Sequence, residues 1–150
     1  MMDLEDILNY VQLSDHIATS GQPMASQFKL IAEYGYGSII NLAMDNAHNA
    51  VANESKPLES LGISYYHIPV PFDSPTTLHF QQFVTTLSTL EGQKVWIHCA
   101  MNYRVSAFMY LYLRQVKGLS DKEAKSPMFK HWKPDKIWSK FMLTNHTNLE

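Results

Sequence analysis

Short apolar runs alternate along this chain with longer segments of helical periodicity. A run that is apolar throughout is typical of a strand buried on both faces of a sheet, whereas apolar residues at helical spacing indicate an amphipathic helix. Strands are therefore predicted within residues 14–23, as a brief edge strand, and at residues 38–43, 65–70 and 94–98.

The segments between these strands predict helices with recognisable ends. Ser74 and Pro75 predict the N-cap and first position of one helix, and Ser120 with Glu123 predicts a capping box for another. Residues 104–117 are apolar on nearly every side, which indicates a central, buried helix. Further helices are predicted at residues 24–34 and from near Pro134. The irregular, partly helical stretch after residues 38–43 is predicted to close with a helical turn that starts near Pro57 and ends at Gly62. Because strands alternate with helices, we expect one α/β domain over residues 1–150, with a central, mostly parallel sheet of four to five strands and helices on both faces.

Composition agrees with a globular chain and excludes several classes of protein. Of the 150 residues, 45% are hydrophobic and 17% are charged, which excludes a disordered chain and a coiled coil. No apolar run approaches the roughly 18 residues of a membrane span, and the N-terminus shows no secretory signal, so we expect a soluble, cytoplasmic protein. The single cysteine excludes an internal disulfide and a multi-cysteine zinc site. The seven histidines show no metal-ligand spacing, so no metal is expected.

The net charge of −2 conceals an uneven distribution. Residues 114–140 hold eight basic and three acidic residues, while the rest of the chain holds four basic and eleven acidic ones. This basic segment is either an ordinary solvated helical surface or a rim that attracts anionic substrates. With only two arginines and no interleaving of basic and aromatic residues, a nucleic-acid partner is not expected.

The chemistry of the chain concentrates where the strand at residues 94–98 meets the following helix. Cys99 lies directly before the helix N-terminus, where the helix dipole and the nearby Arg104 would stabilise a thiolate. Arg104 can clamp an anion with two hydrogen bonds, and the amides between the two residues can form a cradle for a tetrahedral oxyanion. Asn102 suits the left-handed conformation that such a tight turn requires. Alternatively, Cys99 is a small buried apolar residue, although the adjacent His98 and Arg104 favour a chemical role.

This segment resembles the signature of the cysteine-based protein tyrosine phosphatases in their small, dual-specificity-like form. The resemblance rests on His98-Cys99 through Arg104, at the end of a strand and opening a helix. The upstream segments TSGQP, GYGSIINLA and LGISYYHIPV are similar to a bacterial branch of that superfamily with a shortened loop. The resemblance covers residues 16 to about 117 and implies a dual-specificity phosphatase-like fold that needs no cofactor.

The resemblance also implies a role for each residue of the site. Cys99 would be the nucleophile of a phosphomonoester hydrolase, and Asp73, on the loop after the strand at 65–70, would be the general acid. Asp73 also suits an ordinary helix-entry turn, and Asp45 is the reserve candidate for the acid. His98 is expected to be a buried hydrogen-bonding residue that supports the site. The substrate would be held by Ala100, Met101, Asn102, Tyr103 and Arg104. A phosphorylated protein or a small phosphorylated metabolite is the expected partner, with no membrane involved.

Two departures from the superfamily pattern leave alternatives open. Only four residues separate Cys99 from Arg104, instead of the five of the phosphatases, and four is also the spacing of rhodanese-like sulfurtransferases. Such an enzyme would carry a persulfide on Cys99 and need no acid at Asp73. The superfamily places Ser or Thr directly after the arginine, but here Val105 intervenes before Ser106, which reaches the sulfur only if the shorter loop brings it close. A non-catalytic phosphate-binding module is the remaining alternative.

Overall fold

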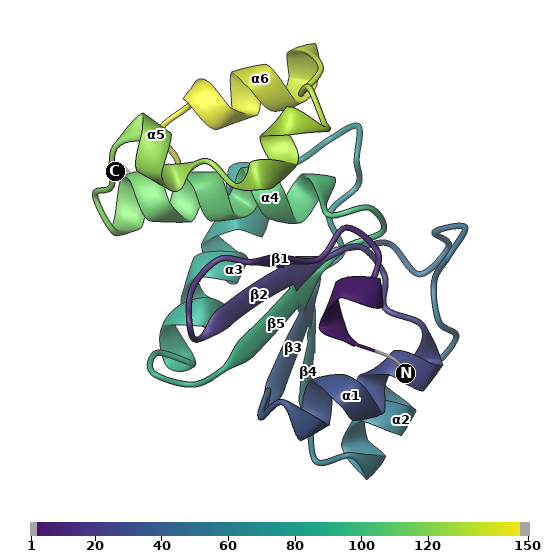
Figure 1. Ribbon diagram of the computed structural model, residues 1–150. Helices are drawn as coiled ribbons and strands as arrows, with labels where there is room; N and C mark the ends of the chain where they lie inside the picture. Colours follow the sequence, from purple (N-terminus) through teal and green to yellow (C-terminus); the bar gives the residue numbers. More distant parts are fainter. Residues whose placement is uncertain (1–2, 148–150) are drawn as a thin grey trace.

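The computed structural model describes residues 3–147, in which five strands form one sheet in the order β1-β2-β5-β3-β4 (Figure 1). Strands β2, β5, β3 and β4 run parallel, and β1 pairs antiparallel with β2. The α/β fold with a mostly parallel sheet is therefore confirmed. The strands are β1 Val11–Gln12, β2 Ile17–Ser20, β3 Ser38–Asn41, β4 Ser64–His67 and β5 Val95–His98.

One prediction about the sheet is wrong, because the strand expected at its edge is not an edge strand. Strand β2 lies between β1 and β5, and the two-residue strand β1 forms the edge. A strand of two residues has no periodicity that could reveal it in the sequence. The predicted strands at 38–43, 65–70 and 94–98 appear as the shorter strands β3, β4 and β5.

Helices cover both faces of the sheet, as predicted. The helix expected at residues 104–117 continues from α4 into a π-helical turn at Tyr112–Val116. The capping box of Ser120 and Glu123 is also present. The helices are α1 Phe28–Glu33, α2 Ser55–Ser60, α3 Thr77–Thr89, α4 Tyr103–Leu111, α5 Asp121–Ala124 and α6 Lys136–Leu143, with 3-10 turns at Leu4–Asp6, Ala25–Gln27 and Pro127–Lys130.

The prediction of Ser74 as an N-cap with Pro75 at the first helical position is wrong. Helix α3 begins two residues later, and Thr76 is its N-cap, accepting a hydrogen bond from the His79 amide at 3.2 Å. The Ser74 hydroxyl instead donates to the Asp73 carboxylate at 3.2 Å. Two hydroxyl residues so close together both satisfy the N-cap preference, so the sequence alone does not distinguish them. The later start lengthens the loop that carries Asp73.

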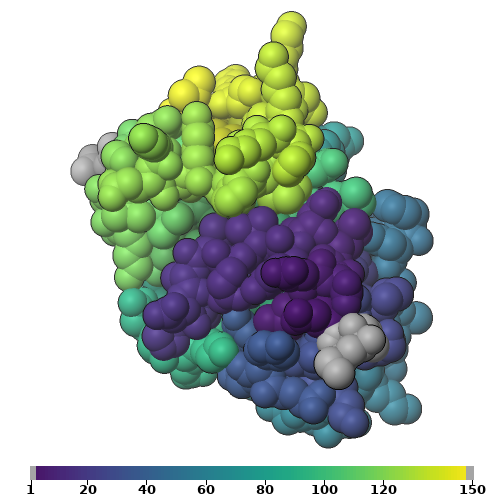
Figure 2. All heavy atoms as spheres, viewed as in Figure 1, coloured from purple at the N-terminus to yellow at the C-terminus, as the bar shows by residue number. Residues whose placement is uncertain are grey.

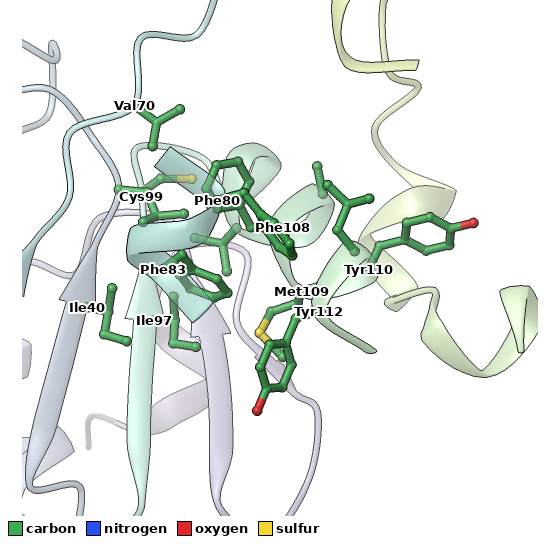
Figure 3. Packing of buried hydrophobic residues seen from close by; sticks show 14 of the residues in the cluster. Ile40, Val70, Phe80, Phe83, Ile97, Cys99, Phe108, Met109, Tyr110 and Tyr112 are labelled. Carbon is green, nitrogen blue, oxygen red and sulfur yellow. The ribbon is translucent and has the colours of Figure 1, made fainter. Parts of the chain in front are cut away.

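The core is divided by the sheet into two layers. Ile39 and Trp96 belong to the cluster on the side of α1 and α2, whereas their neighbours Ile40 and Ile97 belong to the cluster that holds α3, α4 and α6. Successive strand residues point to opposite faces, so both faces of β3 and β5 are buried. Figure 3 shows how Phe108 of α4 packs among the rings of α3. Helix α4 is therefore anchored on the sheet, and its N-terminus is fixed at the carboxyl end of β5.

The N-terminal segment, in purple, runs across the middle of the face shown in Figure 2, beside the C-terminal helices in yellow-green. It supplies contacts to the loop between β5 and α4, described below. Within residues 3–147 we find no helix with the length and apolar character that a bilayer crossing requires.

Candidate active site

The loop that contains Cys99 joins the end of β5 to the start of α4. Cys99 is fully buried, and Figure 3 shows its side chain at the end of β5, on the side where Val70 and Phe80 lie. Asn102 precedes the helix with φ of 70° and ψ of 12°, which is the predicted left-handed conformation. That conformation lets the chain turn sharply from the strand into the helix within four residues.

The Ala100 carbonyl of this loop is held by two donors from distant parts of the chain. The backbone N–H of Gln22 donates to it at 3.0 Å, and the Asn49 side-chain amide donates to it at 3.0 Å. Gly21 pairs with Met101 in an isolated antiparallel bridge, and a Cβ atom at Gly21 would lie only 2.7 Å from the Ala100 oxygen. The end of β2 therefore packs directly against the loop, and glycine permits this approach.

The next two carbonyls of the loop also have donors. The Asn9 side-chain amide donates to the Met101 carbonyl at 2.9 Å, and the Asn102 side-chain amide donates in return to the Asn9 carbonyl at 2.8 Å. The Asn102 carbonyl accepts the Ser106 backbone N–H at 3.2 Å and the Ser106 hydroxyl at 2.5 Å. Because a hydroxyl carries one proton, Ser106 supports the loop carbonyl and has no proton left to donate to the Cys99 sulfur.

The carbonyls of the loop thus face donors on its outer side. In a trans peptide the N–H group points away from the C=O group of the same peptide plane. The N–H groups of Met101 and Tyr103 share peptide planes with the Ala100 and Asn102 carbonyls and therefore point to the opposite side of the loop. The same holds for the N–H of Ala100, because the Cys99 carbonyl in its plane is contacted by His98 Nδ1 at 3.2 Å. Among residues 3–147, no acceptor is found for these three amides or for that of Arg104. Unpaired N–H groups at a strand-to-helix turn are the donors of an anion site.

Arg104 adds a guanidinium group to this site. Arg104 is 7% exposed. One terminal nitrogen of its guanidinium group donates to the Val70 carbonyl at 2.9 Å, and the central carbon of the group lies 5.7 Å from the centroid of the Phe72 ring. In the described part of the chain its Nε atom is buried without a partner. A buried N–H of a permanent cation that lacks an acceptor is a strong attractor for an anion.

The two candidate acids lie on different loops. Asp73 is exposed and lies three residues after Val70 in the sequence. The segment that carries it contacts Arg104 through the Val70 carbonyl and the Phe72 ring. Asp45 is also exposed and lies 3.7 Å from the His67 ring, beside a cavity of about 380 Å³ at the carboxyl ends of β3 and β4. The structure therefore links the Asp73 segment, and not Asp45 itself, to Arg104.

His98 is fully buried and makes two hydrogen bonds, as a supporting residue should. Its Nε2 atom lies 2.7 Å from Glu54 Oε2, and its Nδ1 atom lies 3.2 Å from the Cys99 carbonyl. Glu54 also accepts a hydrogen bond of 2.8 Å from the Gln22 side chain. Nothing in the sequence around Glu54, which lies 44 positions before His98, indicates this contact.

Part of the basic segment lies beside the loop. The ring of Tyr103 stacks on Trp132 with the centroids 5.0 Å apart and the planes nearly parallel. Lys133 follows Trp132 and lines a cavity of about 440 Å³ between the C-terminal helices. The segment of residues 114–140 therefore contacts the loop through the Trp132 ring.

Comparisons with known proteins place these features in context. No family model matches the chain. Over 112 residues, or 73% of the chain, it is 33% identical to the "Beta-lactamase hydrolase-like protein" of two strains of Xylella fastidiosa, and it spans 25% of the length of those relatives.

Solved structures match more of the chain. A protein of Shewanella putrefaciens described as "Putative phosphatase (DUF442)" has a TM-score of 0.83 and 28% identity, with 93% of this chain and 91% of that one covered. The active form of Tk-PTP has a TM-score of 0.76 at 20% identity, over 94% of this chain and 98% of that one. PTPMT1 in complex with PI(5)P has a TM-score of 0.76 at 18% identity, over 91% and 94%. The similarity to Tk-PTP and to PTPMT1 is a similarity of fold.

Proposed function

Because the chain belongs to the superfamily of cysteine-based protein tyrosine and dual-specificity-like phosphatases, we propose that it hydrolyses a phosphomonoester through a phosphocysteine on Cys99. The observation that carries the proposal is the loop between β5 and α4. Its carbonyls are bound to outside donors, while the amides of Ala100, Met101 and Tyr103 and the Nε atom of Arg104 have no acceptor among residues 3–147. A tetrahedral dianion supplies the acceptors that these groups lack.

The proposed reaction has two displacements at phosphorus. In the first, the Cys99 thiolate forms the S–P bond as the bond to the ester oxygen breaks, and Asp73 protonates that leaving oxygen. In the second, Asp73, now a carboxylate, takes a proton from water as the water attacks phosphorus and releases the thiolate. Arg104 and the loop amides hold the three equatorial oxygens in both transition states. The products are an alcohol and inorganic phosphate.

We further propose that the substrate is a phosphorylated protein or a small phosphorylated metabolite. The positive charge of residues 114–140, a segment whose Trp132 stacks on Tyr103 of the loop, favours an anionic substrate.

A sulfurtransferase is the second candidate, because four residues separate Cys99 from Arg104. The two functions differ in what the cysteine holds: a phosphoryl transition state requires many donors and an acid, whereas a persulfide requires few donors and no acid. Purified protein is offered an aryl phosphate and, separately, thiosulfate with cyanide. We expect phosphate release that Cys99→Ser abolishes, and negligible thiocyanate. Thiocyanate formation that persists in Asp73→Asn, without phosphate release, would establish the sulfurtransferase.

The same assay, run with an alkyl phosphate whose leaving oxygen needs a proton, decides between the two candidate acids. Asp45→Asn is the matched control for Asp73→Asn, since both residues are exposed aspartates that follow parallel strands. We expect Asp73→Asn to lower phosphate release and Asp45→Asn to leave it near the wild-type value. The reverse pattern would transfer the role to Asp45.

A further inference from the structure

We propose that Glu54 is a positioning residue that holds the His98 ring at Nε2 and, through it, fixes the direction of the Cys99 carbonyl. This inference rests on the function proposed above for Cys99. Glu54 directly precedes helix α2, far from the loop in sequence, yet its side chain is only 3% exposed and that of His98 is fully buried. A carboxylate is buried at this depth only when its hydrogen bonds are satisfied.

Both oxygens of the Glu54 carboxylate have partners. Oε2 lies 2.7 Å from His98 Nε2, and Oε1 accepts from Gln22 Nε2 at 2.8 Å. The backbone N–H of the same Gln22 donates to the Ala100 carbonyl at 3.0 Å. Glu54 is therefore connected to the catalytic loop along two routes, one through the His98 ring and one through Gln22.

The contacts of the His98 ring determine where its protons lie. The Cys99 carbonyl has no proton to donate, so the 3.2 Å contact is a hydrogen bond only if Nδ1 carries a proton. Nε2 then shares a single proton with Glu54, either as an imidazolium and a carboxylate or as a neutral ring and a protonated acid. In both forms the pair is neutral overall and Nδ1 remains a donor. The Cys99 carbonyl thus takes the Nδ1 proton, while Glu54 holds the opposite edge of the ring through Nε2.

The position of the ring affects the anion site directly. The Cys99 carbonyl and the Ala100 N–H belong to one peptide plane and point in opposite directions. A ring that holds the carbonyl therefore directs the Ala100 N–H to the side where the phosphate would bind. Without Glu54, the ring loses the hydrogen bond at Nε2 that fixes its orientation, so Nδ1 no longer holds the carbonyl oxygen in one direction.

Two substitutions separate positioning from simple packing. In Glu54→Gln, the amide oxygen can still accept from Gln22, and the amide N–H can donate to Nε2 of a ring protonated on Nδ1. We expect this variant to keep most of the wild-type kcat. In Glu54→Ala, we expect kcat for an aryl phosphate to fall by about 10²-fold, the typical value of one donor to the transition state, with KM nearly unchanged. Ile31→Val, in the core beneath the same face of the sheet, is the control for a loss of stability without a change at His98.

The decisive readout is the nitrogen NMR signal of the His98 ring, assigned by its absence in His98→Gln. We expect a protonated Nδ1 with a slowly exchanging hydrogen in the wild type and in Glu54→Gln, and rapid exchange of that hydrogen in Glu54→Ala, where the ring is no longer held at Nε2. An unprotonated Nδ1 in the wild type would overturn the proposal, even if Glu54→Ala does not fold. So would a Glu54→Gln variant as impaired as Glu54→Ala. Because the ring signal does not depend on turnover, a protein that releases no phosphate would refute the proposed function and leave the Glu54 result standing.

Discussion

Gly21 is a position where a single methyl group should disturb the loop between β5 and α4, which carries the proposed nucleophile. In Gly21→Ala the new Cβ would lie 2.7 Å from the Ala100 carbonyl oxygen and 2.9 Å from a methyl carbon of Leu8. Ordinary van der Waals contact begins near 3.4 Å. The loop carbonyl must therefore move by about 0.7 Å or the end of β2 must shift by a similar amount, since close-packed interiors deform little.

The displacement translates into a measurable loss. Catalytic groups tolerate misplacement of only about 0.5 Å, and an error of about 1 Å costs on the order of 10²-fold in rate. We therefore expect kcat for an aryl phosphate to fall by about 10-fold to 10²-fold. Overpacking should also lower the free energy of unfolding by about 1–3 kcal/mol, which leaves folded protein for the assay in a domain of ordinary stability.

Gly37→Ala is the matched control for this substitution. A Cβ at Gly37 meets no atom within 4 Å, and its φ lies outside the left-handed region, so the same methyl group is accommodated there. Initial rates with an aryl phosphate and urea unfolding curves are measured for both variants. A Gly21→Ala protein with the kcat of Gly37→Ala would refute the view that the close approach of β2 positions the loop.

Three further predictions concern proton transfer, the thiol and a buried phenol. Asp73→Asn should lower turnover by about 10² to 10⁴-fold for a poor leaving group and little for an aryl phosphate of low phenol pKa, and an equal loss for all leaving groups would contradict the acid role. Iodoacetate at neutral pH should alkylate Cys99 faster in the native protein than in urea, because the folded site stabilises the thiolate; slower alkylation would indicate a buried apolar residue. Burial raises the pKa of Tyr65 from 10.0 to about 12. Its contribution to stability is therefore present below pH 10 and lost as pH rises toward 12, so urea unfolding should show a smaller alkaline loss of stability for Tyr65→Phe than for the wild type.

The features that could be predicted from the sequence are local ones. Strand β5, the loop after it and helix α4 follow one another without a break, so the positions of Cys99 and Arg104 and the left-handed Asn102 could be predicted from neighbouring residues. The buried, supporting position of His98 was predictable for the same reason. Such predictions rest on spacing and backbone preference, which act within a few residues.

The features that could not be predicted depend on contacts between distant residues. Asn9 and Asn49 bind loop carbonyls 92 and 51 positions away, and Glu54 binds His98 across 44 positions. Asparagine and glutamate are ordinary surface and turn residues, so their types carry no signal of these contacts. They become visible only when the sheet order brings β2, β3 and β5 together.

The most direct test of the proposed function is to trap the covalent intermediate. The protein is mixed with an aryl phosphate, quenched in acid during turnover, digested and examined by mass spectrometry, with Cys99→Ser as the control. The account predicts a phosphoryl group on the peptide that contains Cys99 and none in the variant. Phosphate release by an enzyme that never carries this adduct, or that works equally well as Cys99→Ser, would contradict it.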